Sequence, residues 1–156
     1  VSVAPCATRV RLDLQTLGIE PDELGPAVER AMTALRETLA DERGRWILDP
    51  HHRDAASELQ LTGIVEGRLV SVAIDRTFID TDGTRWIIDF KTSSPRDEDV
   101  AAFLAEEVDR YRPQLERYAG LARALGPEPV RTALYFPLLA AFRECAGLSS
   151  DRSAAR

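Results

Sequence analysis

The sequence is almost devoid of lysine, since a single lysine, Lys91, stands against nineteen arginines. On a solvated surface arginine serves as well as lysine, and elsewhere in this chain it takes that place. Lys91 falls in the stretch WIIDFKTSS, residues 86–94, two residues after Asp89 on an otherwise apolar predicted strand. Arginine holds its proton too tightly to replace an ammonium group chemically. A lone lysine at this place therefore indicates that the ammonium group itself is needed.

Long hydrophobic runs, a secretory signal and paired cysteines are also missing. No apolar run approaches the ~20 residues of a membrane span, and Cys6 and Cys145 have neither metal-binding nor redox spacing. We therefore expect a cytoplasmic protein without a membrane partner. A glycine-rich Walker A loop is absent, so no ATP site is expected in this chain. The net charge of −6 excludes a global basic field, so any DNA contact must be local or supplied by attached domains.

The remaining composition is that of an ordinary globular domain. The chain has 156 residues, of which 44% are hydrophobic and 29% charged, and this suits one domain with a real core. We expect a single domain over residues 1–146 and a flexible tail of small and polar residues over 147–156. Because the chain starts at Val1 and not at methionine, we expect a processed protein or a piece of a longer one.

Hydrophobic residues recur with a helical period in two segments. Residues 21–48 are predicted as a helix that begins at Pro21, a residue suited to a first helical position. Residues 100–125 are also helical by period, but they contain Pro113. Since proline removes an amide donor and clashes with the preceding turn, a kink or a fresh start is expected near 109–113.

A period of two follows a loop that is predicted at residues 49–57. Strands are predicted over 58–67, 68–80 and 85–92, with a hairpin turn at the TDGT segment before the third. Residues 130–139 are predicted as a last, buried strand. The resulting order α-β-β-β-α-β predicts an α+β domain with a central mixed sheet flanked by helices.

Two aspartates and the lone lysine have an informative spacing. Asp89 and Lys91 are two residues apart on one predicted strand, so their side chains share a face. Asp75 lies near the end of the preceding strand, and the short hairpin would bring it beside Asp89. Clustered carboxylates form a hard oxygen site suited to Mg²⁺ or Mn²⁺. A neighbouring ammonium could then steady an attacking water and the negative charge of a phosphodiester transition state.

The alternative is a structural salt bridge between Lys91 and either Asp75 or Asp89. Charged groups on the interior side of an apolar strand are costly unless they are paired or hold a metal. The D-x-K pattern alone satisfies both interpretations, and only the rarity of lysine and the upstream aspartate favour the catalytic one.

The stretch AIDRTFIDTDGTRWIIDFKTSS, followed by YRPQLERY, resembles the nuclease domain of the RecB and AddA family, within the PD-(D/E)xK superfamily. The resemblance covers about residues 20–140. It rests on an I-D-R strand end, a D-x-K strand with threonine after the lysine, and a Q-x-x-x-Y helix, in this order. It implies a restriction-endonuclease-like α-β-β-β-α-β core, usually carried at the C-terminus of a UvrD-like ATP-dependent helicase.

The resemblance also implies roles for individual residues. Asp75 and Asp89 would be ligands of Mg²⁺, or of Mn²⁺, and the backbone carbonyl of Phe90 would complete the metal shell. Lys91 would be the catalytic lysine. Gln114 and Tyr118 match the Q-x-x-x-Y motif, which in the family lies near the active site and helps to order DNA.

Further candidates flank this set. Tyr111 extends the face of Gln114 if the helix continues past Pro113. The alternative for Tyr111 and Tyr118 is an amphipathic helix that docks its tyrosines on the sheet. Glu58 is either a further acidic contributor or a solvent-facing start of a strand. Six arginines could gather around the site and meet phosphates, with ordinary surface pairing as the alternative: Arg76, Arg85, Arg96, Arg110, Arg112 and Arg117.

A metal-binding histidine, common in the family within a G-T-x-x-H context, has no counterpart that matches residue by residue. His51 and His52 fall in the loop-like LDPHHRDA stretch and are not assigned as ligands. We expect the missing histidine upstream of Val1. The chain alone would then hold a metal weakly or be inactive.

We interpret the sequence as an Mg²⁺-dependent deoxyribonuclease domain of exonuclease type. Its substrate would be single-stranded DNA or duplex ends, during DNA end processing and recombinational repair. Its partners would be helicase domains of the same polypeptide and a RecC- or AddB-like subunit. One alternative is a catalytically degenerate nuclease fold for DNA binding or subunit docking, and another is an interaction domain with a structural Asp–Lys pair.

Overall fold

The computed structural model describes residues 4–65, 67–95 and 99–145. Five strands form one sheet in the order β1-β2-β3-β4-β5, and neighbouring strands are antiparallel except for the parallel pair β3–β4. The predicted α+β class with a central mixed sheet is therefore confirmed. The elements are α1 Ala4–Thr16, α2 Pro21–Ala40, α3 Glu42–Leu48, β1 Arg53–Val65, β2 Arg68–Ile79, β3 Arg85–Phe90, α4 Val100–Ala122, β4 Val130–Phe136, a 3-10 helix Pro137–Leu139 and β5 Ala141–Cys145.

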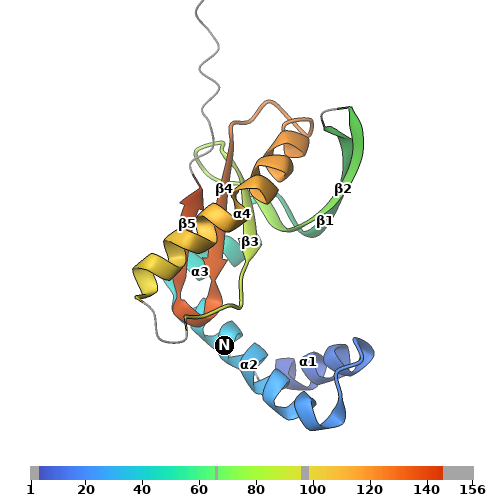
Figure 1. Cartoon of the computed structure of the whole chain (residues 1–156), viewed down its shortest axis with the longest axis vertical. Coiled ribbons are helices and arrows are strands. Elements are labelled where there is room, and N and C mark those ends of the chain that lie inside the picture. The colour runs from blue at the N-terminus through green and yellow to red at the C-terminus, as the bar shows by residue number, and fades with distance from the viewer. Residues whose placement is uncertain (1–3, 66, 96–98, 146–156) are drawn as a thin grey trace, which may run out of the picture.

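Helices α3 and α4 cover opposite faces of the sheet (Figure 1). Ile87 of β3 packs in a buried cluster with Leu104 and Leu115 of α4, whereas its neighbour Ile88 packs with Ile47 of α3. Successive side chains of a strand point to opposite faces. Asp89 is therefore on the same face of the sheet as Ile87, which is the face covered by α4.

Helices α1 and α2 form a hairpin that projects from the sheet (Figure 1). The sequence did not predict α1, whose apolar side chains pack against α2 in a small core of their own. Leu24, Val28 and Met32 are the buried residues of this core, and Ala7, Val10 and Leu14 of α1 pack against them. Burial of this shared apolar stripe stabilises α1, which would be marginal as an isolated helix of 13 residues.

The prediction of one helix over 21–48 is wrong, because the helix is interrupted at Asp41, between α2 and α3. This residue has an extended backbone, φ −78° and ψ 136°, and its carboxylate accepts a hydrogen bond from the amide of Gly44 at 2.9 Å, which caps α3. A Cβ at Gly44 would overlap the carbonyl oxygen of Thr38 and the hydroxyl of Tyr135. The glycine therefore lets α3 turn closely against the end of α2.

Several strand boundaries also differ from the prediction, most at the start of β1 and the end of β4. Residues 49–57 are not all loop, because β1 begins at Arg53 and pairs irregularly with β2 until Ala56. Such a bulge disturbs the alternation of side chains that identifies a strand in a sequence. Glu58 consequently lies inside β1 and does not open it. The predicted strand over 130–139 ends at Phe136 and is followed by the 3-10 helix, and β5 was not predicted.

The kink predicted near 109–113 does not end the helix, because α4 is continuous and contains Pro113 in its interior. Pro113 is exposed, so its ring lies on the solvent side. The lost backbone hydrogen bond is offset by burial of the opposite side of α4, where Leu104 and Leu115 are each 1% exposed.

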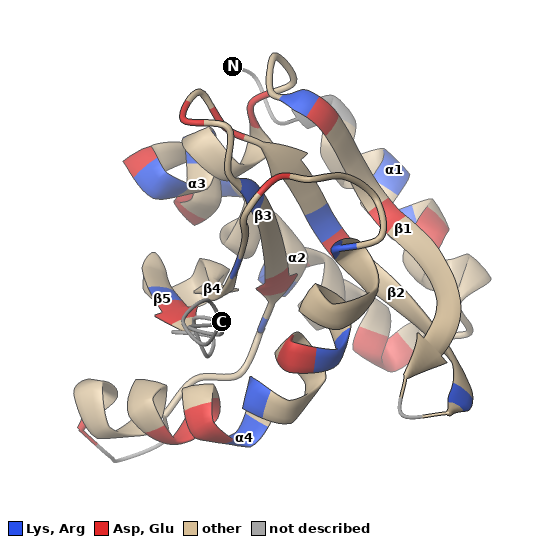
Figure 2. Cartoon of the chain, turned by 90° about the horizontal axis from the view of Figure 1, so that it is seen from above, with Lys and Arg blue, Asp and Glu red and all other residues tan. Residues whose placement is uncertain are grey.

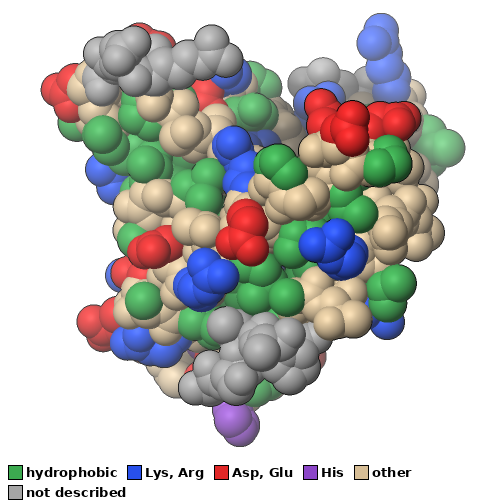
Figure 3. Space-filling model, turned by 90° about the horizontal axis from the view of Figure 1, so that it is seen from below, with side chains coloured by type: hydrophobic (Ala, Val, Ile, Leu, Met, Phe, Trp, Pro, Cys, Tyr) green, Lys and Arg blue, Asp and Glu red, His purple; other side chains and the backbone are tan. Residues whose placement is uncertain are grey.

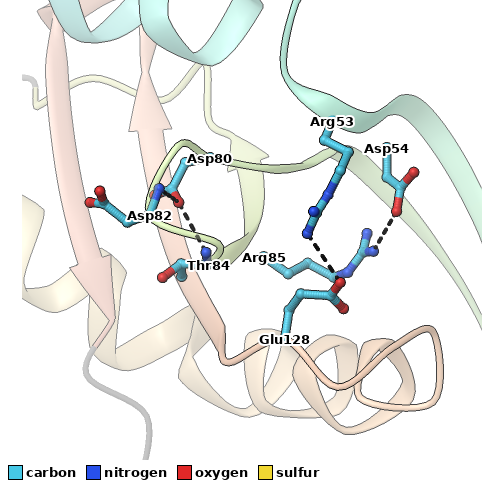
Figure 4. A network of polar contacts seen from close by, with 7 residues as sticks. All are labelled: Arg53, Asp54, Asp80, Asp82, Thr84, Arg85 and Glu128. Carbon is cyan, nitrogen blue, oxygen red and sulfur yellow. Dashed lines mark hydrogen bonds and ion pairs between the residues drawn. The ribbon is translucent and has the colours of Figure 1, made fainter.

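The turn between β2 and β3 is held by Asp80, whose Oδ1 accepts the amides of Asp82 and Thr84 at 2.9 Å each (Figure 4). At the start of β3, Arg85 is buried and pairs with Asp54 at 3.3 Å. This polar network lies at the end of β3 that is remote from Asp89, so it fixes the hairpin without entering the candidate site.

Charges of both signs are mixed over the surface. Basic and acidic residues are interspersed along α4 (Figure 2), and the face drawn in Figure 3 shows both signs among hydrophobic side chains. No helix within the described ranges is long and apolar enough to cross a membrane. The tail expected over 147–156 lies outside the described residues.

Candidate active site

The candidate site forms where β2 and β3 part. Their backbone pairing ends at Arg76 and Ile88, so Asp75 and Asp89 are the next residues along the two strands. At this point Asp75 Oδ2 accepts a hydrogen bond from the amide of Phe90 at 2.8 Å. The carboxylate of Asp75 thus takes the place of a strand carbonyl, which holds it beside Asp89.

Asp89 is the centre of the site. It is 3% exposed, and its Oδ1 accepts a hydrogen bond from Gln114 Nε2 at 3.1 Å. The Lys91 ammonium lies 2.6 Å from Oδ2, a buried oxygen that otherwise receives no hydrogen bond within the described residues. Burial raises the pKa of Asp89 above its ordinary value, an effect that Lys91 opposes and the charge of Asp75 reinforces.

Lys91 follows the last residue of β3 but is still held by the sheet, because its amide donates to the carbonyl of Tyr135 at 2.9 Å. Its side chain is 16% exposed, and the ammonium nitrogen lies 3.6 Å from the centre of the Tyr111 ring. The ammonium is therefore held between a carboxylate and an aromatic face.

Helix α4 presents a row of polar side chains to these strands. Tyr111, Gln114 and Tyr118 follow at three and four residues, so they lie on one side of the helix. Gln114 Nε2 is 2.7 Å from the Tyr118 hydroxyl as well as 3.1 Å from Asp89. Burial raises the pKa of Tyr118, so the hydroxyl stays protonated at neutral pH. The face predicted for these three residues is present, since α4 continues past Pro113.

The oxygen donors fit a small divalent cation. Mg²⁺ is usually held by one or two carboxylates together with water and substrate phosphates, and not by a complete protein cage. Asp75 and Asp89 supply such a pair, but the Lys91 ammonium lies 2.6 Å from Asp89 Oδ2 and would have to share that oxygen with the cation. No group of three or more acidic, histidine or cysteine side chains able to hold a metal occurs among the described residues.

Glu58 and the histidines lie outside these contacts. The pairs next to Glu58 in register, Ser57–Arg76 and Leu59–Ile74, place it opposite Asp75, but it is exposed and has a left-handed backbone with φ 52°. His51 Nδ1 is 2.8 Å from an Asp49 carboxylate oxygen. His52 stacks on Phe78 at 4.1 Å, and its Nε2 is 2.7 Å from the carbonyl of Trp46.

The six candidate arginines do not act as one group. Arg76 is buried and donates to the carbonyls of Ile47 and Asp49, at the end of α3, and Arg85 is buried in the network of Figure 4. These two arginines are therefore structural. Arg110 pairs with Glu107, and Arg112 pairs with Asp109. Arg117 is exposed on α4, and Arg96 lies outside the described residues.

Two contacts near the site were missed by the sequence interpretation. Ser93 Oγ donates to the buried carboxylate of Glu107 at 2.9 Å, and Arg30 Nη2 donates to the carbonyl of Thr92 at 2.7 Å. Glu107 precedes Tyr111 by four residues, so the same helical spacing that identified Gln114 could have identified it. Arg30 had no such signal, because it comes from a helix far away in the sequence.

The fold and this site define a mixed-sheet α+β domain with an aspartate–lysine centre at a strand end. A model of the PD-(D/E)XK nuclease superfamily matches residues 6–151. The chain therefore belongs to the PD-(D/E)XK nuclease superfamily, and nuclease activity is the general class that this membership indicates. No curated protein matches the chain.

Proposed function

We propose that this domain is a metal-dependent deoxyribonuclease and that Asp75, Asp89 and Lys91 form its active site. The observation that carries the proposal is the environment of Asp89, a buried carboxylate that contacts both the only lysine of the chain and Gln114. Even with Lys91 beside it, burial disfavours the charge of Asp89, whose pKa is raised, and this is a cost to stability. Phosphodiester hydrolysis provides a reason for that cost.

Each residue has a distinct role in this proposal. Asp75 and Asp89, with the backbone carbonyl of Phe90, would hold Mg²⁺ or Mn²⁺. The bound ion would supply Lewis-acid activation of water and neutralise the charge that develops on the phosphate. Lys91 would donate hydrogen bonds to the attacking water and to the phosphate oxygens. Gln114 would hold the Asp89 carboxylate in a fixed direction through its 3.1 Å hydrogen bond.

Tyr118 and Tyr111 would support the substrate side of the same site. Tyr118 fixes the amide of Gln114, and the Tyr111 ring limits the movement of the Lys91 ammonium. Stacking of a DNA base on the partly exposed Tyr111 ring is the interaction expected of an aromatic side chain beside single-stranded DNA, whereas Tyr118 is buried and acts only through Gln114. Glu58 would add a further carboxylate next to Asp75 in register.

The biological setting follows from the resemblance of residues 20–140 to the RecB and AddA nuclease domain. We propose an exonuclease-type reaction on DNA ends during end processing and recombinational repair. The domain would work next to ATP-dependent helicase domains of the same polypeptide and beside a RecC- or AddB-like subunit. The mixed surface charge supports this setting, because the domain has net charge −6 and would depend on neighbours to bring DNA to it.

Cleavage by Asp89→Asn tests the proposal. Asparagine keeps the shape and can still accept the hydrogen bond of Gln114, but it removes the charge that would hold the metal. In the full-length protein we expect cleavage of end-labelled DNA in Mg²⁺ to fall by about 10²-fold or more, the scale of losing one electrostatic group of a transition state. Asp82→Asn, in the exposed β2–β3 turn, is the matched control and should cleave like the parent. Cleavage by Asp89→Asn at the rate of the parent and of Asp82→Asn would refute the proposal.

The degenerate nuclease fold is the second candidate, and the Asp89–Lys91 ion pair favours it. At 2.6 Å the ammonium occupies the carboxylate oxygen that a metal would use. In this case the domain would bind DNA or dock a subunit without cutting. A Mn²⁺ titration by calorimetry separates the two functions. A nuclease should bind Mn²⁺, and Asp89→Asn should abolish that binding. A degenerate fold should give the same titration in the parent and in Asp89→Asn while still binding DNA.

A further inference from the structure

Glu107 is a buried acid that the proposed reaction does not use. It lies on α4, is 2% exposed, and pairs with Arg110 at 2.7 Å and with the Ser93 hydroxyl at 2.9 Å. An apolar side chain of similar size at a buried position is often as stable as an ion pair, and sometimes more so. The carboxylate is therefore not explained by stability alone, and its bond to Ser93 points to a role in the neighbouring loop.

Three consecutive residues after β3 are each held from a different element. The amide of Lys91 donates to the carbonyl of Tyr135 on β4, the carbonyl of Thr92 accepts from Arg30 on α2, and the hydroxyl of Ser93 donates to Glu107 on α4. Strand pairing of β3 ends before Thr92. The contacts of Arg30 and Glu107 therefore replace a β-ladder at the point where the chain leaves the sheet.

We propose that Glu107 and Arg30 are positioning residues of the cleavage site. They clamp residues 92–93 and thereby fix the backbone from which the Lys91 side chain reaches Asp89. A lysine side chain is flexible, so the place of its ammonium depends on the direction in which its backbone is held. The inference rests on the proposed function, because it assigns the clamp to the lysine of that same site.

Four variants test the clamp. We expect Ser93→Ala and Arg30→Ala to lower the single-turnover rate of DNA cleavage about tenfold and Glu107→Ala up to about 10²-fold, the cost of a small misplacement of a catalytic group. The DNA dissociation constant, measured by anisotropy in Ca²⁺, should not change. Glu107→Gln should restore most of the rate, because its amide oxygen still accepts from Ser93.

Exposed neighbours on the same helices provide matched controls. Glu106→Gln on α4 and Arg36→Ala on α2 should cleave like the parent protein. If all clamp variants also cleave like the parent, or if Glu107→Gln is as slow as Glu107→Ala, the positioning role is refuted. If Glu107→Ala does not fold, the cleavage rate of Ser93→Ala decides whether the clamp exists. Ser93 is exposed, so removing its hydroxyl should leave the fold intact.

Hydrogen exchange separates this inference from the proposed function. In metal-free protein without DNA, Ser93→Ala and Arg30→Ala should speed amide exchange in a peptide covering residues 91–93, while the controls should not. A parent protein that never cleaves DNA would refute the nuclease proposal, and exchange would then decide the clamp alone. Unchanged exchange in both variants would refute the clamp, whatever the cleavage result.

Discussion

Lys91→Arg separates the catalytic interpretation of the lone lysine from the structural one. The Lys91 ammonium lies 2.6 Å from Asp89 Oδ2 and 3.6 Å from the centre of the Tyr111 ring. A guanidinium can make both contacts, because arginine pairs with carboxylates and stacks on aromatic rings at least as well as lysine does. The substitution therefore keeps the interactions that stabilise the fold and changes the group that would meet the substrate.

The expected magnitudes differ for stability and for cleavage. Lys91→Met leaves the carboxylate of Asp89, which is 3% exposed, without its cation, and should cost at most about 3 kcal/mol of unfolding free energy. For a chain of this size that corresponds to a melting temperature lower by about 9 °C. Lys91→Arg should cost less than about 1 kcal/mol. Its cleavage rate should nevertheless fall by about 10²-fold, because the bulkier, planar cation cannot replace the donor to the transition state.

The assay is single-turnover hydrolysis of end-labelled DNA with saturating Mg²⁺, together with thermal unfolding of each variant. Metal binding should survive in Lys91→Arg, since both aspartates remain. Equal cleavage rates for the parent and Lys91→Arg, at equal melting temperatures, would show that the lysine only balances the aspartates. The catalytic role assigned to it would then be wrong.

Two further predictions concern Asp89 and its partners. Because burial and Asp75 raise the pKa of Asp89 above 3.8, the native state binds its proton more tightly than the unfolded chain, and the corresponding stability is lost as the pH rises through the native pKa. Asp89→Asn should therefore have a higher melting temperature than the parent at pH 7 in EDTA, and the difference should shrink towards pH 4. A higher melting temperature for the parent at pH 7 would contradict this reasoning. Tyr118→Phe removes one of the two partners of the Gln114 amide and should cost about 1 kcal/mol in thermal unfolding. It should also slow cleavage about tenfold by loosening Asp89, whereas Tyr118→Phe with parental cleavage would leave the tyrosine with a packing role only.

The core of the fold could be predicted because its elements carry regular patterns. Strand β2 alternates, β3 is a short apolar run between a turn and a loop, and α4 has a period of three to four; these elements bear the candidate site. The missed elements lack such signals. Strand β5 has only five residues after a 3-10 turn, and α1 is stabilised by packing against α2 and not by its own sequence.

The arrangement of the candidate residues was predictable along the chain and across the β2–β3 hairpin, but not between the sheet and α4. The spacing of Asp89 and Lys91 follows from strand β3 and the residue after it, and that of Gln114 and Tyr118 follows from helix α4. The hydrogen bond of Gln114 to Asp89 and the ring of Tyr111 beneath Lys91 depend on how α4 crosses the sheet. Arg76 was wrongly included among the candidate phosphate contacts, because it follows Asp75 in the sequence. In the structure it donates hydrogen bonds to the carbonyls of Ile47 and Asp49 at the end of α3.

The two aspartates do not carry equal weight as signs of function. Where β2 leaves β3, the amide of Phe90 loses its strand partner, and the carboxylate of Asp75 supplies an acceptor at 2.8 Å. An acceptor is needed there in any protein with this sheet, because an unpaired amide close to the core is costly. Asp89 satisfies no backbone group among the described contacts, and its burial disfavours its own charge. Asp75 can thus be explained by the fold alone, whereas no backbone contact explains Asp89, and for it and the lysine beside it we propose a role in cleavage.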